Sequence, residues 1–302
     1  MTVQPEFREC ADKIGAHVRS LEGVRHPLTA PAALDRAADY VAAELARVGC
    51  RVIELPFIDH GRPYRNIIGT LPGKGEQSEQ VIVMAHYDTV AGSPGADDNA
   101  SGVAVLLEIA AKLALLSFER TILFVGVSLE ENAHDGDHGS GTRGSRALAA
   151  HAREQGWEIA GVIVLESVAF AGEDVIQTAP PGVPITVPKT GNFLAVVGNE
   201  RSEALVDGFS RTVCRLGSDL PHLALTVPGN GERLPDTRRS DHAPFWDAGF
   251  PAVMLTDTTN FRNPHYHRPS DTLETLNLGF AAQVCAVTAA FVAELARPAP
   301  QG

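Results

Sequence analysis

Residues 80–128 read QVIVMAHYDTVAGSPGADDNASGVAVLLEIAAKLALLSFERTILFVGVS, and the order of the patterns in them indicates the fold class. The short apolar run at 80–85 is typical of a strand that is buried on both faces. Apolar residues then recur at helical spacing between Val103 and Ala114. A second apolar run, at 121–128, predicts another buried strand. A strand, a helix and a strand in this order form the repeating unit of an α/β fold.

The same alternation continues on both sides of this unit. Further strands are predicted at 51–57, 66–71, 160–165, 193–197 and 252–255, and further helices at 34–48, 145–155, 203–215 and 278–295. We expect one α/β domain over residues 1–302, a sandwich with a mostly parallel central sheet flanked by helices, with a flexible tail at 297–302. Two stretches rich in Pro and Gly, 172–192 and 227–236, are expected to be lids or walls of a site.

The composition excludes several classes of partner. Acidic residues outnumber basic ones by 37 to 25, which gives a formal charge of −12 and no basic surface for nucleic acid or an acidic membrane. Residues 1–19 lack the apolar core of a signal peptide, and no later run reaches the roughly 18 apolar residues of a membrane span. We expect a cytoplasmic protein, and the sequence leaves its oligomeric state open. Four scattered cysteines are expected to be buried free thiols: Cys10, Cys50, Cys214 and Cys285.

Polar residues that could bind a metal ion or take part in catalysis follow the predicted strands. His86 comes directly after the first buried run, where ligands bind in open α/β sheets, and its imidazole suits zinc. Asp88, two residues on, could orient that ring. Asp98 stands in a glycine-bounded loop, 95–102, just before the next helix. Helix capping would explain one carboxylate there, but not two carboxylates and an amide together.

Three more carboxylates follow the neighbouring strands. Glu130 and Glu131 come after the run at 121–128, and adjacent side chains at a strand end point to opposite faces. One could therefore bind a metal while the other acts as general base, the alternative being a solvated acidic turn. Glu166 follows four apolar strand residues, and a carboxylate there is costly to bury unless it is paired or bound to a metal.

Taken together, these motifs resemble one known family. His86-x-Asp88, the loop 95–102, Glu130-Glu131, Glu166 and His267-x-x-x-Asp271-Thr272 resemble the two-zinc exopeptidase family of leucine-type aminopeptidases, which also contains the glutaminyl cyclases. The five motifs stand in the family's order, and the match covers roughly residues 34–295. It favours His267 over His265 as a ligand, since His267 lies four residues before Asp271. His242 is expected to brace the site through its neighbours Ser240 and Asp241.

The resemblance implies a role for each residue. Five residues would bind two zinc ions: His86, Asp98, Glu131, Glu166 and His267. His86 and Glu166 would complete one site and Glu131 and His267 the other, with Asp98 bridging them. Glu130 would be the general base, Asp88 would orient His86, and the peptide bond after Asp98 would be cis.

The implied activity is that of a zinc-dependent metallo-aminopeptidase, which removes N-terminal residues from peptides or from small aminoacyl amides. Three alternatives stay open at this point. The chain could be a glutaminyl cyclase-like acyltransferase with one zinc, a hydrolase of small amides, or an inactive relative that serves as a binding module. Metal content and the fate of test substrates would distinguish them.

Two features depart from the family pattern. Glu166 stands where the family more often has Asp, and its extra methylene is expected to weaken the zinc that it holds with His86. The connection 132–143 is longer than usual in the family and contains His134, Asp135, Asp137 and His138. Its charges are expected to be solvated, the alternative being a pocket wall or an additional metal site.

Overall fold

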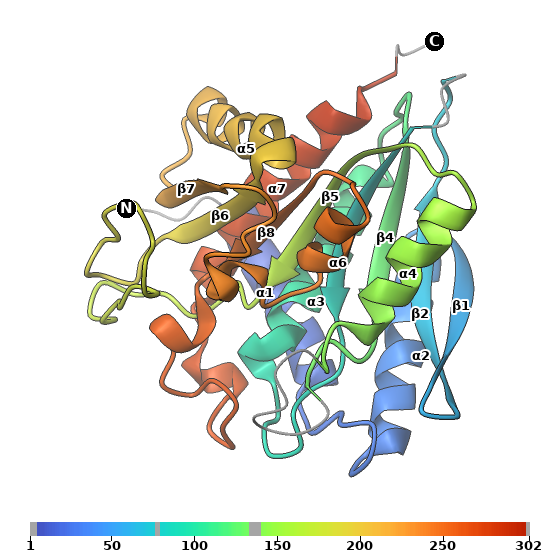
Figure 1. Ribbon diagram of the computed structural model, residues 1–302, viewed down its shortest axis with the longest axis horizontal. Helices are drawn as coiled ribbons and strands as arrows, with labels where there is room; N and C mark the ends of the chain where they lie inside the picture. The colour runs from blue at the N-terminus through green and yellow to red at the C-terminus, as the bar shows by residue number, and fades with distance from the viewer. Residues whose placement is uncertain (1–4, 76–78, 133–139, 300–302) are drawn as a thin grey trace.

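The computed structural model of the chain describes residues 5–75, 79–132 and 140–299. The described strands form an eight-stranded sheet in the order β1-β2-β4-β3-β5-β8-β6-β7 (Figure 1). The strands are β1 (Arg51–Asp59), β2 (Arg62–Leu71), β3 (Gln80–His86), β4 (Thr121–Val127), β5 (Ile159–Glu166), β6 (Leu194–Asn199), β7 (His222–Val227) and β8 (Ala252–Thr256). The α-helices are α1 (Pro5–Leu21), α2 (Pro31–Arg47), α3 (Gly102–Leu113), α4 (Arg143–Glu154), α5 (Glu203–Leu216), α6 (His242–Asp247) and α7 (Leu278–Ala296).

The centre of the sheet is parallel. β4, β3, β5 and β8 are neighbours and run in the same direction, so that their carboxyl ends meet at one edge. β2 pairs antiparallel with β1 and β4, and β6 pairs antiparallel with β8 and parallel with β7. The predicted α/β sandwich with a mostly parallel sheet is confirmed.

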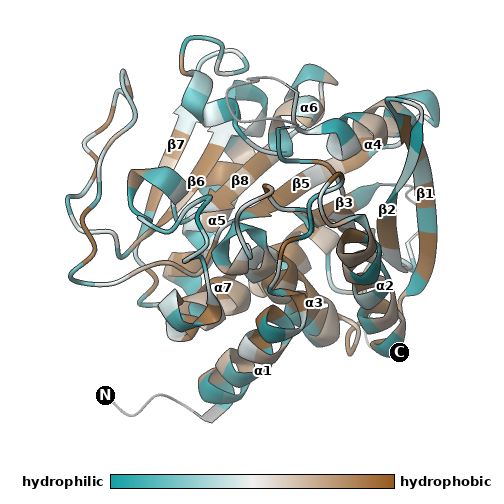
Figure 2. Cartoon of the chain, turned by 90° about the horizontal axis from the view of Figure 1, so that it is seen from below, coloured by the Kyte–Doolittle hydropathy of each residue, from teal (hydrophilic) through white to brown (hydrophobic). Residues whose placement is uncertain are grey.

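Helices cover both faces of the sheet. α1, α2, α3, α5 and α7 lie on one face, and α4 and α6 lie on the other (Figure 1, Figure 2). Strand β3 shows why its sequence is apolar throughout. Val81, Val83 and Ala85 pack into the first layer, Ile82 and Met84 pack into the second, and all are fully buried.

Helix α7 is a long apolar helix of the described chain. By length and composition it is apolar enough to cross a membrane, although the sequence showed no uninterrupted apolar run of that length. In the molecule it packs against α1, α3 and α5, and Val284 and Cys285 are completely buried. Its apolar character is therefore that of a core helix.

The cysteines follow the prediction with one exception. All four are free, and Cys10, Cys50 and Cys285 are buried as expected. Cys214, near the end of α5, is exposed, so that its predicted burial is wrong. It lies on the outer side of an amphipathic helix whose buried residues include Phe209 and Val213.

Candidate metal centre

The predicted site residues lie at one edge of the sheet, at or just after the carboxyl ends of its central strands. His86 is the last residue of β3 and Glu166 the last residue of β5, while Glu130 and Glu131 follow the end of β4. The chain turns sharply after β4, because Leu129 has the left-handed φ of 60°. Side chains from three neighbouring strands thus point into the same space beyond the sheet.

Asp98 comes from an irregular turn, η1 (Ala96–Ser101), that leads into α3. As the resemblance implies, the Asp98–Asn99 peptide bond is cis. The Asn99 side chain fastens this turn to the end of β5: its Nδ2 donates to the carbonyl of Leu165 (2.8 Å), and its Oδ1 accepts from the N–H of Ser167 (3.1 Å). The turn is therefore fixed directly beside Glu166.

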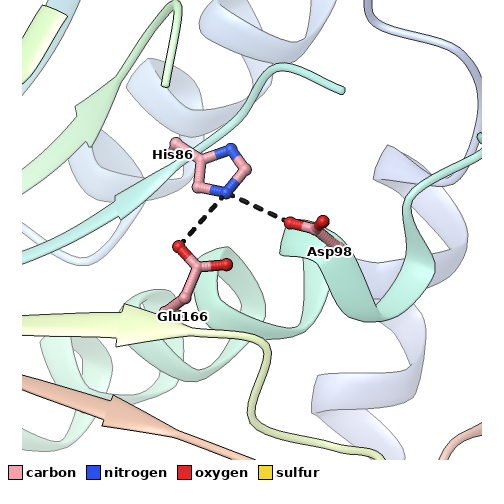
Figure 3. Close-up of side chains that lie close together, drawn as sticks. All are labelled: His86, Asp98 and Glu166. Carbon is pink, nitrogen blue, oxygen red and sulfur yellow. Dashed lines mark ion pairs between the residues drawn. The ribbon is translucent and has the colours of Figure 1, made fainter. Parts of the chain in front are cut away.

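Two clusters of possible ligands share Asp98. In the first, His86 Nε2 lies 3.3 Å from Asp98 Oδ1 and 3.5 Å from Glu166 Oε2 (Figure 3). In the second, His267 Nε2 lies 3.2 Å from Asp98 Oδ2 and 3.2 Å from Glu131 Oε2. Within each cluster one donor atom from every residue lies within 4.8 Å of the others. The two oxygens of Asp98 thus face different histidines, which is the arrangement of a bridging carboxylate.

The donor set fits zinc. His86 Nε2 and His267 Nε2 are buried and have no hydrogen-bond partner among the described residues, and Glu131 Oε1 has none either. Buried polar atoms without partners are costly unless something else satisfies them. Imidazole nitrogens with carboxylate oxygens are ligands that zinc takes in catalytic sites, and these two clusters can hold two such ions.

The pKa values of the clustered side chains in the metal-free site also indicate a cation site. Burial opposes a charge on His267, but the carboxylates of Glu131 and Asp98 outweigh burial and raise the pKa of His267 to about 10. Burial, and then the charge of Asp98, raise the pKa of Glu131 to about 7. Burial disfavours a charged His86 as well, yet Glu166 and the other carboxylates hold its pKa well above the usual value. The clustered negative charge draws protons that a cation would replace.

Glu130 and Asp88 stand next to the clusters. Glu130 Oε2 lies 3.9 Å from His86 Nε2, and burial, together with Glu166 and Glu131, raises the pKa of Glu130 well above its usual range. Asp88 Oδ1 lies 3.4 Å from His86 Nδ1. The Asp88 carboxylate also accepts the N–H groups of Glu130 and Glu131, both at 3.1 Å. It thereby ties the end of β3 to the turn after β4.

Two polar residues support the clusters from outside. The Asp271 carboxylate accepts the N–H groups of Asp97 (2.9 Å) and Asp98 (3.2 Å) and so holds the turn η1. Ser240 Oγ donates to Glu166 Oε2 at 2.6 Å. The bracing that was predicted for the segment around His242 is thus made by Ser240.

Arg25 is a supporting residue that no sequence motif indicated. It is 2% exposed, and within the described parts of the chain its guanidinium group donates only to backbone carbonyls. Nε donates to Tyr87 O (2.8 Å), Nη1 to Pro94 O (2.8 Å) and Nη2 to Gly95 O (2.9 Å). Nη1 also donates to the carbonyls at the end of α1 and just after it. The cation therefore fixes the loop that connects His86 to Asp98.

The other candidate histidines lie outside both clusters. The ring of His265 contacts Ser270 Oγ at 2.9 Å, and that of His242 contacts Thr237 O at 2.8 Å. Trp246 is buried, and its Nε1 donates to Ala252 O, which agrees with a packing role. Of the loop 132–143, His134, Asp135, Asp137 and His138 lie outside the described residues.

A cavity opens beside the clusters. Asp98, Glu130 and Glu166 line its inner end. The segment 172–192 contributes a wall through Val183, Ile185 and Val187, and the segment 227–236 contributes Asp236 at its end. Both Pro- and Gly-rich stretches therefore form walls of a site, as expected.

Known structures share this fold. The LapA aminopeptidase of Legionella pneumophila superposes with a TM-score of 0.73 at 18% identity, over 98% of this chain and 74% of that one. The glutaminyl cyclase of Porphyromonas gingivalis superposes with a TM-score of 0.72 at 23% identity, over 94% of this chain and 98% of that one. At such identities these similarities establish the fold alone.

Sequence relatives define the family. The uncharacterized protein YfbL of Escherichia coli K12 is 32% identical over 280 residues, which cover 88% of this chain and 83% of that protein. A probable leucine aminopeptidase of Trichophyton verrucosum is 26% identical over 82% of this chain, which spans only 61% of the fungal protein. The family described as "Peptidase family M28" matches residues 66–292. The chain belongs to peptidase family M28.

Proposed function

We propose that the chain is a zinc-dependent aminopeptidase-type hydrolase, with two ions held by His86, Asp98, Glu131, Glu166 and His267. One observation carries the proposal: two buried His–carboxylate clusters share Asp98, and their histidine Nε2 atoms have no hydrogen-bond partner among the described residues. The leucine aminopeptidases among the relatives support the same activity.

Zinc bound in these clusters would polarise the scissile carbonyl and lower the pKa of the attacking water. The chain's own residues would handle the protons. Glu130 lines the cavity beside both clusters, and its raised pKa suits a base that takes a proton from water and returns it to the leaving amine. Asp88 would keep Nε2 of His86 turned toward the first cluster, since it contacts the opposite ring nitrogen.

The same carboxylates would select an N-terminal residue. Four carboxylates line the cavity, those of Asp98, Glu130, Glu166 and Asp236, against one cation, Arg239, so that its polar end carries a net negative charge before metal binds. A free α-ammonium group would be attracted there, whereas a substrate carboxylate would be repelled. This supports cleavage at the amino end of a peptide or of an aminoacyl amide.

Glutaminyl cyclase activity is a second candidate. It is supported by the cyclase of Porphyromonas gingivalis, 98% of whose chain superposes. The two activities differ in their products: a cyclase releases ammonia and leaves a closed N-terminal ring, whereas a hydrolase releases a free amino acid.

The test combines metal content with product analysis. The purified protein should hold two zinc ions per chain by mass spectrometry of the metals and should release amino acids from leucyl amides. One zinc per chain, with ring closure of N-terminal glutamine and no hydrolysis, would establish the cyclase instead. Retention of no zinc after dialysis against micromolar zinc would reject both.

A further inference from the structure

The cavity leads away from the metal centre across the sheet. Glu166 of β5 stands opposite Thr256 of β8, Thr256 opposite Ala195 of β6, and Ala195 opposite Leu223 of β7. Residues that are opposite in register share one face of a sheet. All four line the same cavity, so that its floor continues from Glu166 over three further strands.

A second row of the floor runs beside the first. Met254, Val197 and Leu225 are also opposite one another in register, and all three line the cavity. These residues stay 6–8% exposed, whereas Val196 and Leu255, on the other face of the same strands, are 0% exposed. The face that α1, α2, α3, α5 and α7 cover is fully packed here, whereas on the face of α4 and α6 the cavity leaves a small part of the apolar surface accessible.

The opposite side of the cavity is apolar as well. Val183, Ile185 and Val187 line it at every second position of the segment 172–192, and each is half-buried. The whole cavity, from the metal centre to its opening into solvent, has a volume of about 850 Å³. Floor and wall together form an elongated apolar trough that begins at Glu166, and we call it the trough.

The trough is longer than an amino-acid side chain. From β5 to β7 it crosses three strand spacings, roughly 14 Å at about 4.8 Å each. A leucine side chain would reach across about one of them. An alkyl chain of roughly ten or eleven carbon atoms, at about 1.3 Å per carbon, would fill the same length.

We propose that the trough holds an elongated apolar group of the substrate, an alkyl or arylalkyl chain attached next to the scissile amide. This rests on the proposed hydrolytic function of the metal centre. Hydrolysis would add water across the C–N bond and release a carboxylic acid and an amine, one of which carries the chain. The amides of the proposed function would accordingly be amphiphilic ones.

The first experiment varies the chain length on either side of the amide. One series is amides of α-amino acids with unbranched alkyl side chains of two to twelve carbons, and the other is leucyl amides of alkylamines of the same lengths. In at least one series kcat/KM should rise by up to about fourfold per added methylene, the effect of burying one, and level off near ten carbons. Flat profiles or a decline beyond four carbons in both series would overturn the proposal.

Variants of the residues that line the trough test whether the alkyl chain of the substrate binds there. Ala195→Phe should block the floor at the second strand from Glu166 and lower the ratio of long-chain to short-chain kcat/KM at least tenfold. Ile185→Ser, on the wall, should lower that ratio in the same direction. Ile176→Ser is the matched control, because Ile176 lies on the same segment but is 77% exposed and is not among the residues that line the cavity. If the ratio of long-chain to short-chain kcat/KM is unchanged in the first two variants, the alkyl chain of the substrate binds outside the trough.

A binding measurement separates this proposal from the proposed function. Displacement of a fluorescent alkylamine by alkylamines of two to twelve carbons needs no turnover. Tighter binding of longer chains to the wild type, and its loss in Ala195→Phe, would support the trough even if no amide were hydrolysed. Hydrolysis of short leucyl amides without any chain-length effect on rate or binding would support the function and reject the trough.

Discussion

Among the individual residues, Asp98 is the one that belongs to both clusters of the candidate metal centre. Its Oδ1 faces His86 and its Oδ2 faces His267, at 3.3 and 3.2 Å. Burial opposes its charge, but the two histidines keep the pKa of Asp98 below its usual value, so that it stays ionised. No other described carboxylate contacts both rings, and its loss would dismantle both clusters together.

Glu130 offers a sharp test of the proton transfer. Replacing Glu130 with Gln keeps the size of the side chain and removes the base, so that kcat should fall by about 10² or more while both zinc ions stay bound. Steady-state kinetics and metal analysis of the same sample measure this. Glu131→Gln is the matched control, because it removes a proposed ligand and should lower zinc content first. Nearly full activity of Glu130→Gln would assign the proton transfer to another group.

Glu166 tests the departure from the family pattern. We expect the ion held by Glu166 and His86 to be the weaker one, because the longer side chain has one more torsion to fix. The Ser240 hydrogen bond at 2.6 Å restrains that torsion, so that Ser240→Ala should weaken this ion further. Titration with a chelator, followed by metal analysis, should show stepwise loss with one tightly bound zinc left.

The replacement Glu166→Asp completes this test. It should tighten the weak site or leave it unchanged. Simultaneous release of both ions from the wild type would show that the glutamate is fully accommodated and that the expectation is wrong.

Among the secondary-structure elements, the junction between η1, α3 and β5 positions the bridging carboxylate. A Cβ atom at Gly102 would lie 2.3 Å from Asn99 Oδ1 and 2.8 Å from the backbone oxygen of Leu165. The first residue of α3 can approach the end of β5 only because it is glycine. The position of Asp98, four residues earlier, depends on that approach.

Gly102→Ala should therefore push α3 away from β5 and disturb the metal centre. We expect a lower melting temperature and zinc affinity reduced at least tenfold, measured by calorimetry and by competition with a chromophoric chelator. Gly92→Ala is the control in the loop that precedes η1, because a Cβ atom there would meet nothing within 4 Å. Equal behaviour of the two variants would contradict this account.

The sequence predicts most elements because their patterns are long. β3 and β5 lie within one residue of the predicted runs, since a strand buried on both faces is apolar throughout. β7 was not predicted, because it is a half-exposed edge strand whose apolar residues give no clear alternation. α6 was missed as well, because its six residues are too few for a helical period to show.

The residues of the candidate metal centre can be predicted from the same apolar runs. Its proposed ligands stand directly after apolar runs, so that strand order alone predicts their meeting. Arg25 could not be found in this way. Its partners Tyr87 and Gly95 lie 62 and 70 positions away, and no local pattern distinguishes it from a surface arginine.

The molecule as a whole concentrates buried negative charge at one edge of its sheet. Burial, then neighbouring charges, raise the pKa of Glu131 and Asp241 to about 7, and burial raises that of Asp257 to about 6. The folded metal-free protein therefore binds more protons than the unfolded chain between about pH 4 and pH 7. The free energy of unfolding should consequently fall as the pH rises through this range.

Zinc should remove this dependence. A bound cation favours the ionised carboxylates, so that the melting temperature of the zinc-loaded protein should rise relative to the metal-free form as the pH increases from 5 to 8. Scanning calorimetry of both forms at each pH measures the difference. A difference that shrinks toward pH 8 would show that the buried carboxylates are not linked to the metal.

The Arg25 side chain has a consequence for how relatives of this chain are compared. It lies before residue 66, where the family match begins, yet it holds the loop between two proposed ligands. A search confined to the matched segment would thus omit part of what gives the centre its shape. In a relative without an arginine here, water or a donor from another part of the chain would have to satisfy the same carbonyls. Two chains with the same five proposed ligands would then differ in how firmly the loop between His86 and Asp98 is held.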